Sequence, residues 1–292
     1  MLESVIETRR RDLGGFEVGR VLPHAKRRMV GPFIFFDRLG PATFAPHIPR
    51  ATDVRPHPHI GLSTITYLFE GEITHRDSLG CEQVIRPGEI NWMTAGRGIT
   101  HSERFDGMRE RGGAIDGIQA WVALPQADEE TAPAFDHYAA AELPVIKAPG
   151  VSARLIAGSA YGERSTVKTH SPLFYVHAAL EPGARLALPA DYAERAVYVV
   201  RGEIGAEGQK FEATQMPVFG AGAAPQIEAL AAATVMLLGG APLGPRLIWW
   251  NFVSSRRERI LEAMADWKAQ RMALPVNDDR EFTPLPDDPP PA

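Results

Sequence analysis

Two short pairs of metal-binding side chains lie close together in the first half of the chain. His57 and His59 are separated by one residue, and His101 and Glu103 have the same spacing. Side chains at i and i+2 point to the same face of a β-strand, so each pair can direct both of its groups toward one point. Two neighbouring strands of this kind would bring four ligands to a single metal ion.

The chemistry of such a site follows from the ligand types. Three imidazoles and one carboxylate supply three nitrogens and one oxygen, which suits first-row divalent metals such as Fe, Mn, Co, Ni or Cu. The ion keeps one or two positions open, and a catalytic metal uses an open position to hold substrate, water or dioxygen. Histidines bind metal as neutral rings, so we expect occupancy to fall below about pH 6. Two pairs in one strand-rich region favour a metal site over isolated polar turns.

The surrounding residues predict short strands that would position these pairs. Of the 292 residues, 27 are Gly, 25 are Pro and 45% are hydrophobic, so we expect a turn-rich fold with a buried core. Runs of β-branched and aromatic residues predict the strands themselves. The predicted strands cover residues 31–37, 60–69, 73–78, 81–86, 90–94, 115–124, 151–157 and 172–180.

Three further segments do not follow the strand pattern. Residues 125–149 are rich in Ala, Pro and acidic residues, which predicts a linker or an irregular crossover. One helix is predicted where the capping-box spacing of Ser255 and Glu258 precedes apolar residues at helical spacing up to Trp267. Residues 277–292 are acidic and rich in Pro, so we expect an extended surface tail.

An internal repeat divides the chain into two similar parts. Residues 67–73 read YLFEGEI and residues 198–204 read YVVRGEI, an offset of 131 residues. In both copies a strand, a turn and a Gly-containing apolar strand follow. Two similar β-domains in tandem are therefore predicted. We assign residues 1–135 to an N-terminal domain with the metal site, and residues 136–292 to a C-terminal domain with the helix and tail.

The second copy lacks the candidate ligands. At the same offset, His57 corresponds to Leu188 and His59 corresponds to Ala190. The counterpart of His101 is expected to be Ile227 or Gln226. We therefore predict one metal ion per chain, in the N-terminal domain.

Several motifs resemble one known family. Residues 56–61 read PHPHIG, residues 66–71 read TYLFEG, and residues 92–103 read WMTAGRGITHSE. These segments resemble the pirin family of the cupin superfamily, in the form seen in bacterial members. The resemblance runs from about residue 13 to about residue 285. It implies an all-β bicupin fold, in which two antiparallel β-barrels (double-stranded β-helices) stand in tandem with a short C-terminal helix.

The resemblance also implies the ligands and the metal. Carried over residue by residue, it makes His57, His59, His101 and Glu103 the metal ligands. Iron, as Fe(II), is the metal that it implies, with Mn, Co, Ni, Cu or Zn as alternatives. Typical cupins place a Glu four or five residues after the His pair, where this chain has Ser63 and Thr64. Glu103 supplies the carboxylate instead, as it does in sequences that look like pirins.

The function implied by the resemblance is a metal-dependent dioxygenase of the quercetin 2,3-dioxygenase type. Such an enzyme opens a flavonol or a related cyclic substrate with O₂, and Glu103 would be both ligand and catalytic base. An alternative from a different class is a non-enzymatic, iron-binding co-regulator that senses redox state and binds a transcription factor. A third interpretation is an oxygenase for another cyclic substrate, with quercetin as a surrogate.

Composition restricts the partners and the location. A net charge of −5 argues against direct nucleic-acid binding. The chain has no secretory leader pattern and no apolar run that could cross a membrane, and its single cysteine suits a reducing compartment. We therefore expect a cytoplasmic monomer that acts on a small molecule and O₂. Among the remaining histidines, His75 could contact a metal ligand, but we expect it to face solvent or to make a polar contact with a neighbouring strand. His137 is expected to lie in a loop.

Overall fold

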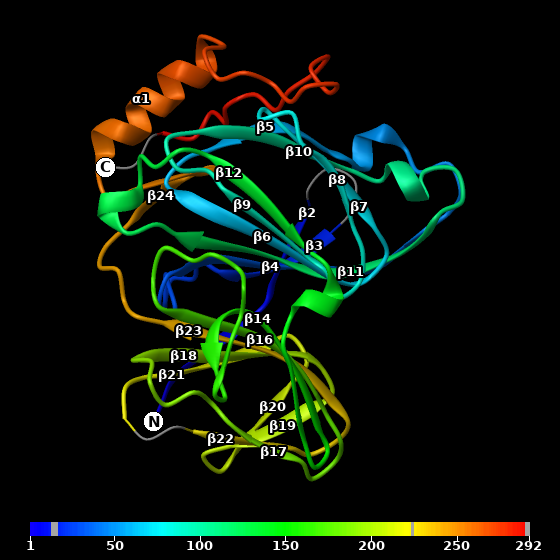
Figure 1. Cartoon of the computed structure of the whole chain (residues 1–292), viewed down its shortest axis with the longest axis vertical. Coiled ribbons are helices and arrows are strands. Elements are labelled where there is room, and N and C mark those ends of the chain that lie inside the picture. Colours follow the sequence, from blue (N-terminus) through cyan, green and yellow to red (C-terminus); the bar gives the residue numbers. More distant parts are fainter. Residues whose placement is uncertain (13–16, 223–224, 290–292) are drawn as a thin grey trace. The chain divides into compact units, whose positions relative to one another are not determined.

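The computed structural model describes residues 1–12, 17–222 and 225–289, and it consists mainly of β-strands (Figure 1). It divides into two compact units. One unit, here called the N-terminal barrel, contains residues 11–18, 38–137 and 243–292. The other, the C-terminal barrel, contains residues 1–10, 19–37 and 138–242. The predicted all-β fold of two barrels with one C-terminal helix is confirmed.

Two antiparallel sheets carry the candidate ligands of the N-terminal barrel and their neighbours. The first has seven strands, in the order β12 (Ala134–Tyr138), β9 (Ile90–Thr94), β6 (Leu62–Glu70), β11 (Gly113–Ala123), β4 (Phe33–Phe44), β3 (Glu17–Leu22) and β2 (Arg9–Asp12). The unit boundaries fall within β2, β3 and β4, so part of each of these strands is assigned to the other unit. The second has four strands, in the order β5 (Val54–His59), β10 (Ile99–Arg104), β7 (Ile73–Asp77) and β8 (Glu82–Ile85). The predicted turn at Glu70 and Gly71 joins β6 to β7.

The C-terminal barrel has two sheets of the same kind. The larger sheet runs in the order β1 (Leu2–Glu7), β21 (Gln215–Phe219), β18 (Glu194–Arg201), β23 (Ala233–Gly240), β16 (Leu173–Leu180), β14 (Val151–Ala160) and β13 (Val145–Ala148), and β15 (Glu163–Arg164) pairs with β14. The smaller sheet runs in the order β17 (Arg185–Ala187), β22 (Gln226–Ala229), β19 (Glu203–Ala206) and β20 (Gln209–Glu212). Apart from the first strand of each larger sheet (β12 in one barrel, β1 in the other) and the short β15, this order repeats that of the N-terminal barrel, so the repeat seen in the sequence is a repeat of topology.

The two compact units are not two continuous halves of the chain that meet at residue 135, because each end of the chain belongs to the unit formed mainly by the other half. The first strand, β1, pairs with β21 and extends the larger sheet of the C-terminal barrel. Residues 243–292 belong to the N-terminal barrel, although our division placed them with the second domain. They form the hairpin of β24 (Leu247–Trp249) and β25 (Phe252–Ser254) and the helix α1 (Arg257–Lys268). The units therefore exchange their terminal segments.

The helix α1 forms because one of its faces is apolar. Ile260, Ala263 and Trp267 recur at helical spacing and are buried against Phe252 and Ile60. The predicted capping box is wrong: Arg256 is the N-cap and makes no side-chain cap bond, because the Ser255 hydroxyl donates to Glu129 instead. Among the described residues, no helix has the length and apolar character needed to cross a membrane.

The segment predicted as an irregular linker contains regular structure. It holds β12, β13 and two short 3₁₀ helices, Gln126–Asp128 and Ala140–Glu142. Two further 3₁₀ helices, Arg50–Thr52 and Asp106–Met108, lie outside this segment. The low β-propensity of this segment concealed β12, which pairs with β9 at one end of the seven-stranded sheet. As a consequence, His137 lies on a strand and not in a loop.

Candidate metal centre

Three of the predicted ligands meet inside the N-terminal barrel. His57 and His59 lie on β5, and His101 lies on the neighbouring strand β10, opposite His57 in the ladder. One ring nitrogen from each of the three lies within 4.8 Å of the other two, and all three residues are buried. The i, i+2 spacing therefore directs the β5 pair to one face, and strand pairing brings the third imidazole to them.

Hydrogen bonds on the far side of two rings determine which nitrogen is available. The Nδ1–H of His57 donates to the Arg55 carbonyl at 2.9 Å, and that of His59 donates to the Asn251 carbonyl at 3.1 Å. A carbonyl only accepts, so Nδ1 carries the proton in each ring and Nε2 keeps its lone pair. This is the arrangement of a metal-ligating histidine whose other nitrogen is fixed by a hydrogen bond.

The electrostatics keep these rings neutral. Burial lowers the pKa of His57 to about 4. Burial also lowers the pKa of His59 and of His101 well below the ordinary value, and the neighbouring histidines lower both further. Neutral rings at physiological pH are ready to bind a metal without first losing a proton.

The donor set fits a divalent metal. In the described part of the chain, Nε2 of His59 and Nε2 of His101 are buried without a hydrogen-bond partner. A buried nitrogen lone pair without a partner is costly, and three converging imidazoles are the common donor set for first-row metals. A metal bound there would satisfy these atoms.

Glu103, the predicted fourth ligand, is near the three histidines but is not a member of their close group. Gln119 Nε2 donates to Glu103 Oε1 at 3.3 Å, and the Thr66 hydroxyl is 3.4 Å from the same oxygen. That hydroxyl is also 2.8 Å from Gln119 Oε1, and its single proton can serve only one acceptor. Burial raises the pKa of Glu103 to about 7, although both neighbours oppose the rise. A carboxyl group with this pKa suits proton transfer near neutral pH.

His75 is buried and contacts a candidate ligand on the neighbouring strand. It is buried on β7, its Nδ1 is 3.4 Å from Nδ1 of His101, and its Nε2 donates to Asp77 Oδ2 at 2.9 Å. The other oxygen of Asp77 accepts the backbone N–H groups of Leu79 and Cys81. With Nε2 donating to Asp77, Nδ1 of His75 is the acceptor for the Nδ1–H of His101. Of the expected alternatives, the solvent-facing one is wrong, and the contact with a neighbouring strand and with a candidate ligand is the one that the structure shows.

Aromatic side chains surround these rings. The edge of Trp121 contacts His59 with ring centroids 5.0 Å apart, and Phe135 stacks on His75 at 4.3 Å. Phe135 comes from β12, inside the segment predicted to be irregular. His137, two residues farther along, is 2.7 Å from the side-chain oxygen of Asn91. The interior is therefore partly aromatic and partly polar.

Of the residues that surround the three histidines, one pair had a recognisable spacing in the sequence and two residues had none. His75 and Asp77 form a third i, i+2 pair, the same spacing as the two ligand pairs, and could have been recognised from it. Gln119 stands in an ordinary strand, and Asn251 contributes only a backbone carbonyl, so neither has a sequence signal.

The ladder registers identify the residues that replace the ligands in the C-terminal barrel. Leu188 is the counterpart of His57, and its N–H donates to the Pro225 carbonyl at 2.9 Å. Pro225 therefore stands where His101 stands in the N-terminal barrel, since β17 and β22 continue in the same register. The expectation of Ile227 or Gln226 at this position is wrong, because the connection before β22 differs in length from that before β10.

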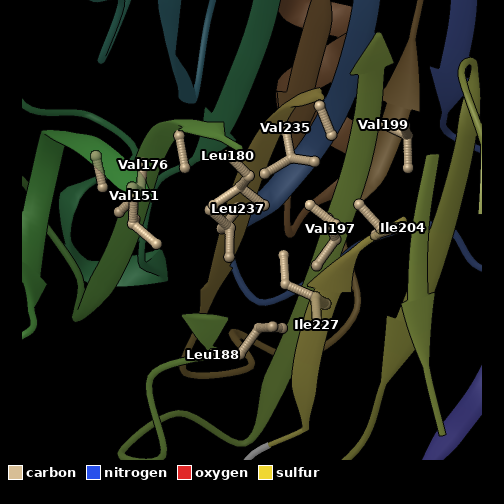
Figure 2. Close-up of a cluster of buried hydrophobic side chains, with 14 of the residues drawn as sticks. Val151, Val176, Leu180, Leu188, Val197, Val199, Ile204, Ile227, Val235 and Leu237 are labelled. Atoms are coloured by element: carbon tan, nitrogen blue, oxygen red, sulfur yellow. The ribbon is translucent and has the colours of Figure 1, made fainter. Parts of the chain in front are cut away.

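The position of Glu103 is also apolar in the C-terminal barrel. In the N-terminal barrel Glu103 lies opposite His75, and in the C-terminal barrel Ile227 lies opposite Ala206. Ile227 and Leu188 belong to the buried hydrophobic cluster of that barrel (Figure 2). Among its described residues no group of metal-binding side chains is found.

Comparison with known proteins points to one family. The family model for pirin matches residues 15–122, and the model for the pirin C-terminal cupin domain matches residues 175–273. A pirin-like protein of Caulobacter vibrioides is 60% identical over 288 residues, which is 98% of this chain and 100% of that protein. Human pirin is 30% identical over 274 residues, or 91% of each chain.

A solved structure shares both the fold and a measurable sequence identity. The crystal structure of a quercetin 2,3-dioxygenase from Acinetobacter baumannii superposes with a TM-score of 0.90 at 32% identity. The match covers 99% of this chain and 96% of that chain. The likeness therefore extends over both barrels.

Proposed function

The chain belongs to the pirin family, and from that premise we propose that it is a metal-dependent dioxygenase of the quercetin 2,3-dioxygenase type. The observation that carries the proposal is the group of three buried imidazoles, with Glu103 beside it. The similarity to the Acinetobacter baumannii enzyme supports the same reaction class. The substrate would be a flavonol or a related cyclic compound, and the co-substrate would be O₂.

The three histidines would hold the metal, with Glu103 as the fourth ligand or as a close neighbour. Fe(II) is the metal that we propose, and Mn, Co, Ni, Cu or Zn suit the same donor set. When bound, such a metal supplies Lewis acidity and a site for dioxygen chemistry. The ring hydrogen bonds to Arg55, Asn251 and His75 would keep Nε2 of each ligand directed at the metal.

Glu103 would remove the proton of the substrate hydroxyl. Its raised pKa, about 7, lets it accept this proton at neutral pH and hold it while the ring opens. The Gln119 amide, which donates to Glu103, would keep the carboxyl group directed into the barrel. Trp121, which packs against His59 in a T-shaped arrangement, would offer apolar contact to a flat ring bound beside the histidines.

Turnover of quercetin tests this proposal. The protein is loaded separately with Fe(II), Mn(II), Co(II) or Ni(II) and mixed with quercetin in air and under nitrogen. We expect loss of the flavonol absorbance and release of carbon monoxide only in air. If none of the metals gives dioxygen-dependent loss of absorbance, quercetin is not a substrate, and related cyclic compounds are then tested in the same assay.

The alternative function, an iron-sensing co-regulator, makes a different prediction. Its partner would bind the ferric form of the protein and not the ferrous form. A pull-down with the ferric and the ferrous protein distinguishes the two cases, because a dioxygenase requires no such partner.

A further inference from the structure

A segment near the C-terminus contacts both strands that carry the candidate ligands. Residues 277–283, here called the C-terminal strap, belong to the same compact unit as β5 and β10. Their contacts with those strands join residues 174 to 228 positions apart in sequence, and they lie outside both family-model matches. Three of the contacts of the C-terminal strap are made at or beside ligand positions.

The first contacts are on β10. His101 and Glu103 point to one face of this strand, so the alternating residues Ser102 and Arg104 point to the other. Asp278 accepts hydrogen bonds from both: Oδ2 is 2.6 Å from the Ser102 hydroxyl and 2.8 Å from Arg104 Nε, and Oδ1 is 2.8 Å from Arg104 Nη2. One carboxylate therefore holds the outer side of the strand whose inner side carries two candidate ligands.

The second contact is on β5, the edge strand of its sheet. Its ladder with β10 is interrupted between His101 and Glu103, where β5 has one extra residue. A bulge of this kind leaves backbone groups outside the ladder. Beside it, the Pro56 carbonyl accepts the Thr283 N–H at 2.8 Å, and the Arg55 carbonyl accepts the ring of His57. The C-terminal strap thus supports β5 at the residue before a ligand.

Among the acidic partners of the buried Arg104, Asp278 makes the closest contact and the one with two hydrogen bonds. Arg104 is 1% exposed, and its other partners, Asp53 at 3.5 Å and Glu281 at 3.0 Å, are a distant acid and a partly exposed acid. A buried guanidinium needs a close, bidentate carboxylate, which Asp278 supplies. Burial alone would raise the pKa of Asp278, but the bonds from Arg104 and Ser102 lower it below its usual range.

We propose that Asp278 is a positioning residue for the metal centre, and that the C-terminal strap holds β5 and β10 at the separation that lets the three imidazoles bind one metal ion. This inference rests on the proposed metal centre but not on the proposed substrate. Its test therefore measures metal affinity and not turnover.

The test compares two neighbouring acids in the full-length protein. Asp278→Asn removes the charge that holds Ser102 and Arg104, whereas Asp279→Asn makes the same change at an exposed neighbour. Affinity for Mn(II), Co(II) and Ni(II) is measured by competition with a chelator, together with Tm with and without metal. We expect Asp278→Asn to weaken metal binding about 10-fold or more, in the range of outer-sphere changes. Asp279→Asn should stay within about twofold of the native affinity.

The outcomes separate the two proposals. Equal metal affinity in native protein and Asp278→Asn, with Tm lowered by the same amount with and without metal, would show a merely structural role and overturn the inference. Native protein that binds no metal would instead refute the proposed metal centre. If Asp278→Asn does not fold, Thr283→Pro removes the N–H that Pro56 accepts and the hydroxyl that lies 3.4 Å from the Arg55 carbonyl, and it leaves Asp278 in place. That variant should lower metal affinity several-fold, and unchanged affinity there would also overturn the inference.

Discussion

Apart from one edge strand, the N-terminal and C-terminal barrels share their strand order, but their interiors differ at the candidate ligand positions. His57, His101 and Glu103 lie on β5 and β10. The counterparts in the other barrel are Leu188, directly after β17, Pro225, directly before β22, and Ile227 on β22. The same topology therefore holds a polar group of titratable side chains in one barrel and a continuous apolar cluster in the other (Figure 2). Chemistry in this molecule depends on a few side chains and not on the fold.

The difference also concerns what stabilises each interior. Leu188 and Ile227 are fully buried and stabilise their barrel by the removal of apolar surface from water. The three imidazoles of the other barrel are buried as neutral rings, and two of their nitrogens have no hydrogen-bond partner. A metal ion would satisfy these nitrogens, so we expect metal to stabilise the N-terminal barrel selectively.

The largest expected effect comes from making the first barrel like the second. His57→Leu places at position 57 the residue type found at its counterpart, Leu188. Loss of one ligand should weaken metal binding by at least about 100-fold, since a metal site divides its binding free energy among few ligands. Metal content after purification, measured by elemental analysis, checks this. The reverse change, Leu188→His, should add no metal, because one imidazole without partners does not make a site.

The second prediction concerns the carboxyl group that the C-terminal barrel lacks. Glu103→Gln keeps the size of the side chain but cannot accept the substrate proton. We expect turnover of an active substrate to fall about 100-fold, a typical contribution of a general base. Metal affinity should fall much less, because the three histidines remain. Steady-state kinetics of protein loaded to equal metal content makes the measurement, and unchanged turnover would remove Glu103 from the mechanism.

The third prediction compares the effect on metal affinity of replacing one histidine in each barrel. His75→Leu removes the acceptor for His101 Nδ1 and should weaken metal binding about 10-fold, because outer-sphere partners fix ligand orientation. His177→Leu, on β16 of the C-terminal barrel, is the matched control and should leave metal affinity unchanged. Chelator competition measures both. Equal affinities in the two variants would show that His75 does not orient His101.

The smallest expected effect is the response of the metal-free protein to acid. The pKa of His57 is about 4 in the folded protein and near 6.5 when exposed, and those of His59 and His101 are also lowered. The unfolded chain therefore binds more protons, and the free energy of unfolding should fall as pH falls from about 6.5 toward 4. Glu103 has a raised pKa, so its contribution to the free energy of unfolding rises as pH falls from about 7 to 4.5. This one contribution does not offset the loss from three histidines.

Denaturant unfolding in the presence of a chelator, at pH 7 and at pH 5, measures this loss. His59→Leu should reduce the dependence on pH, since it removes one of the three groups. A free energy of unfolding that is equal at the two pH values in the native protein would contradict the neutral, buried state of the cluster.

The candidate ligands could be predicted because strand geometry is a short-range rule. The i, i+2 spacing of His57 and His59 specifies one face of a strand, whatever the rest of the fold. The repeat of residues 67–73 likewise predicted a second barrel without ligands. The counterpart of His101 was misplaced because the offset changes in the loops between strands, and such a change leaves no mark in a single sequence.

The remaining parts of the site depend on contacts between distant segments. The Asn251 carbonyl reaches His59 across 192 residues, and Asp278 reaches Arg104 across 174. No local pattern indicates such pairs, and the tail that contains Asp278 has the composition of an exposed end. β12 was missed for a similar reason, since pairing with β9 and not its own propensity makes it a strand.

Elemental analysis of the protein purified without added metal tests the central difference between the barrels most directly. The native chain and His101→Ala are purified in parallel, and their metal content per chain is compared. We predict one equivalent of a divalent first-row metal in the native protein and almost none in His101→Ala. Two equivalents in the native protein, or a full equivalent retained by the variant, would contradict a single centre in the N-terminal barrel.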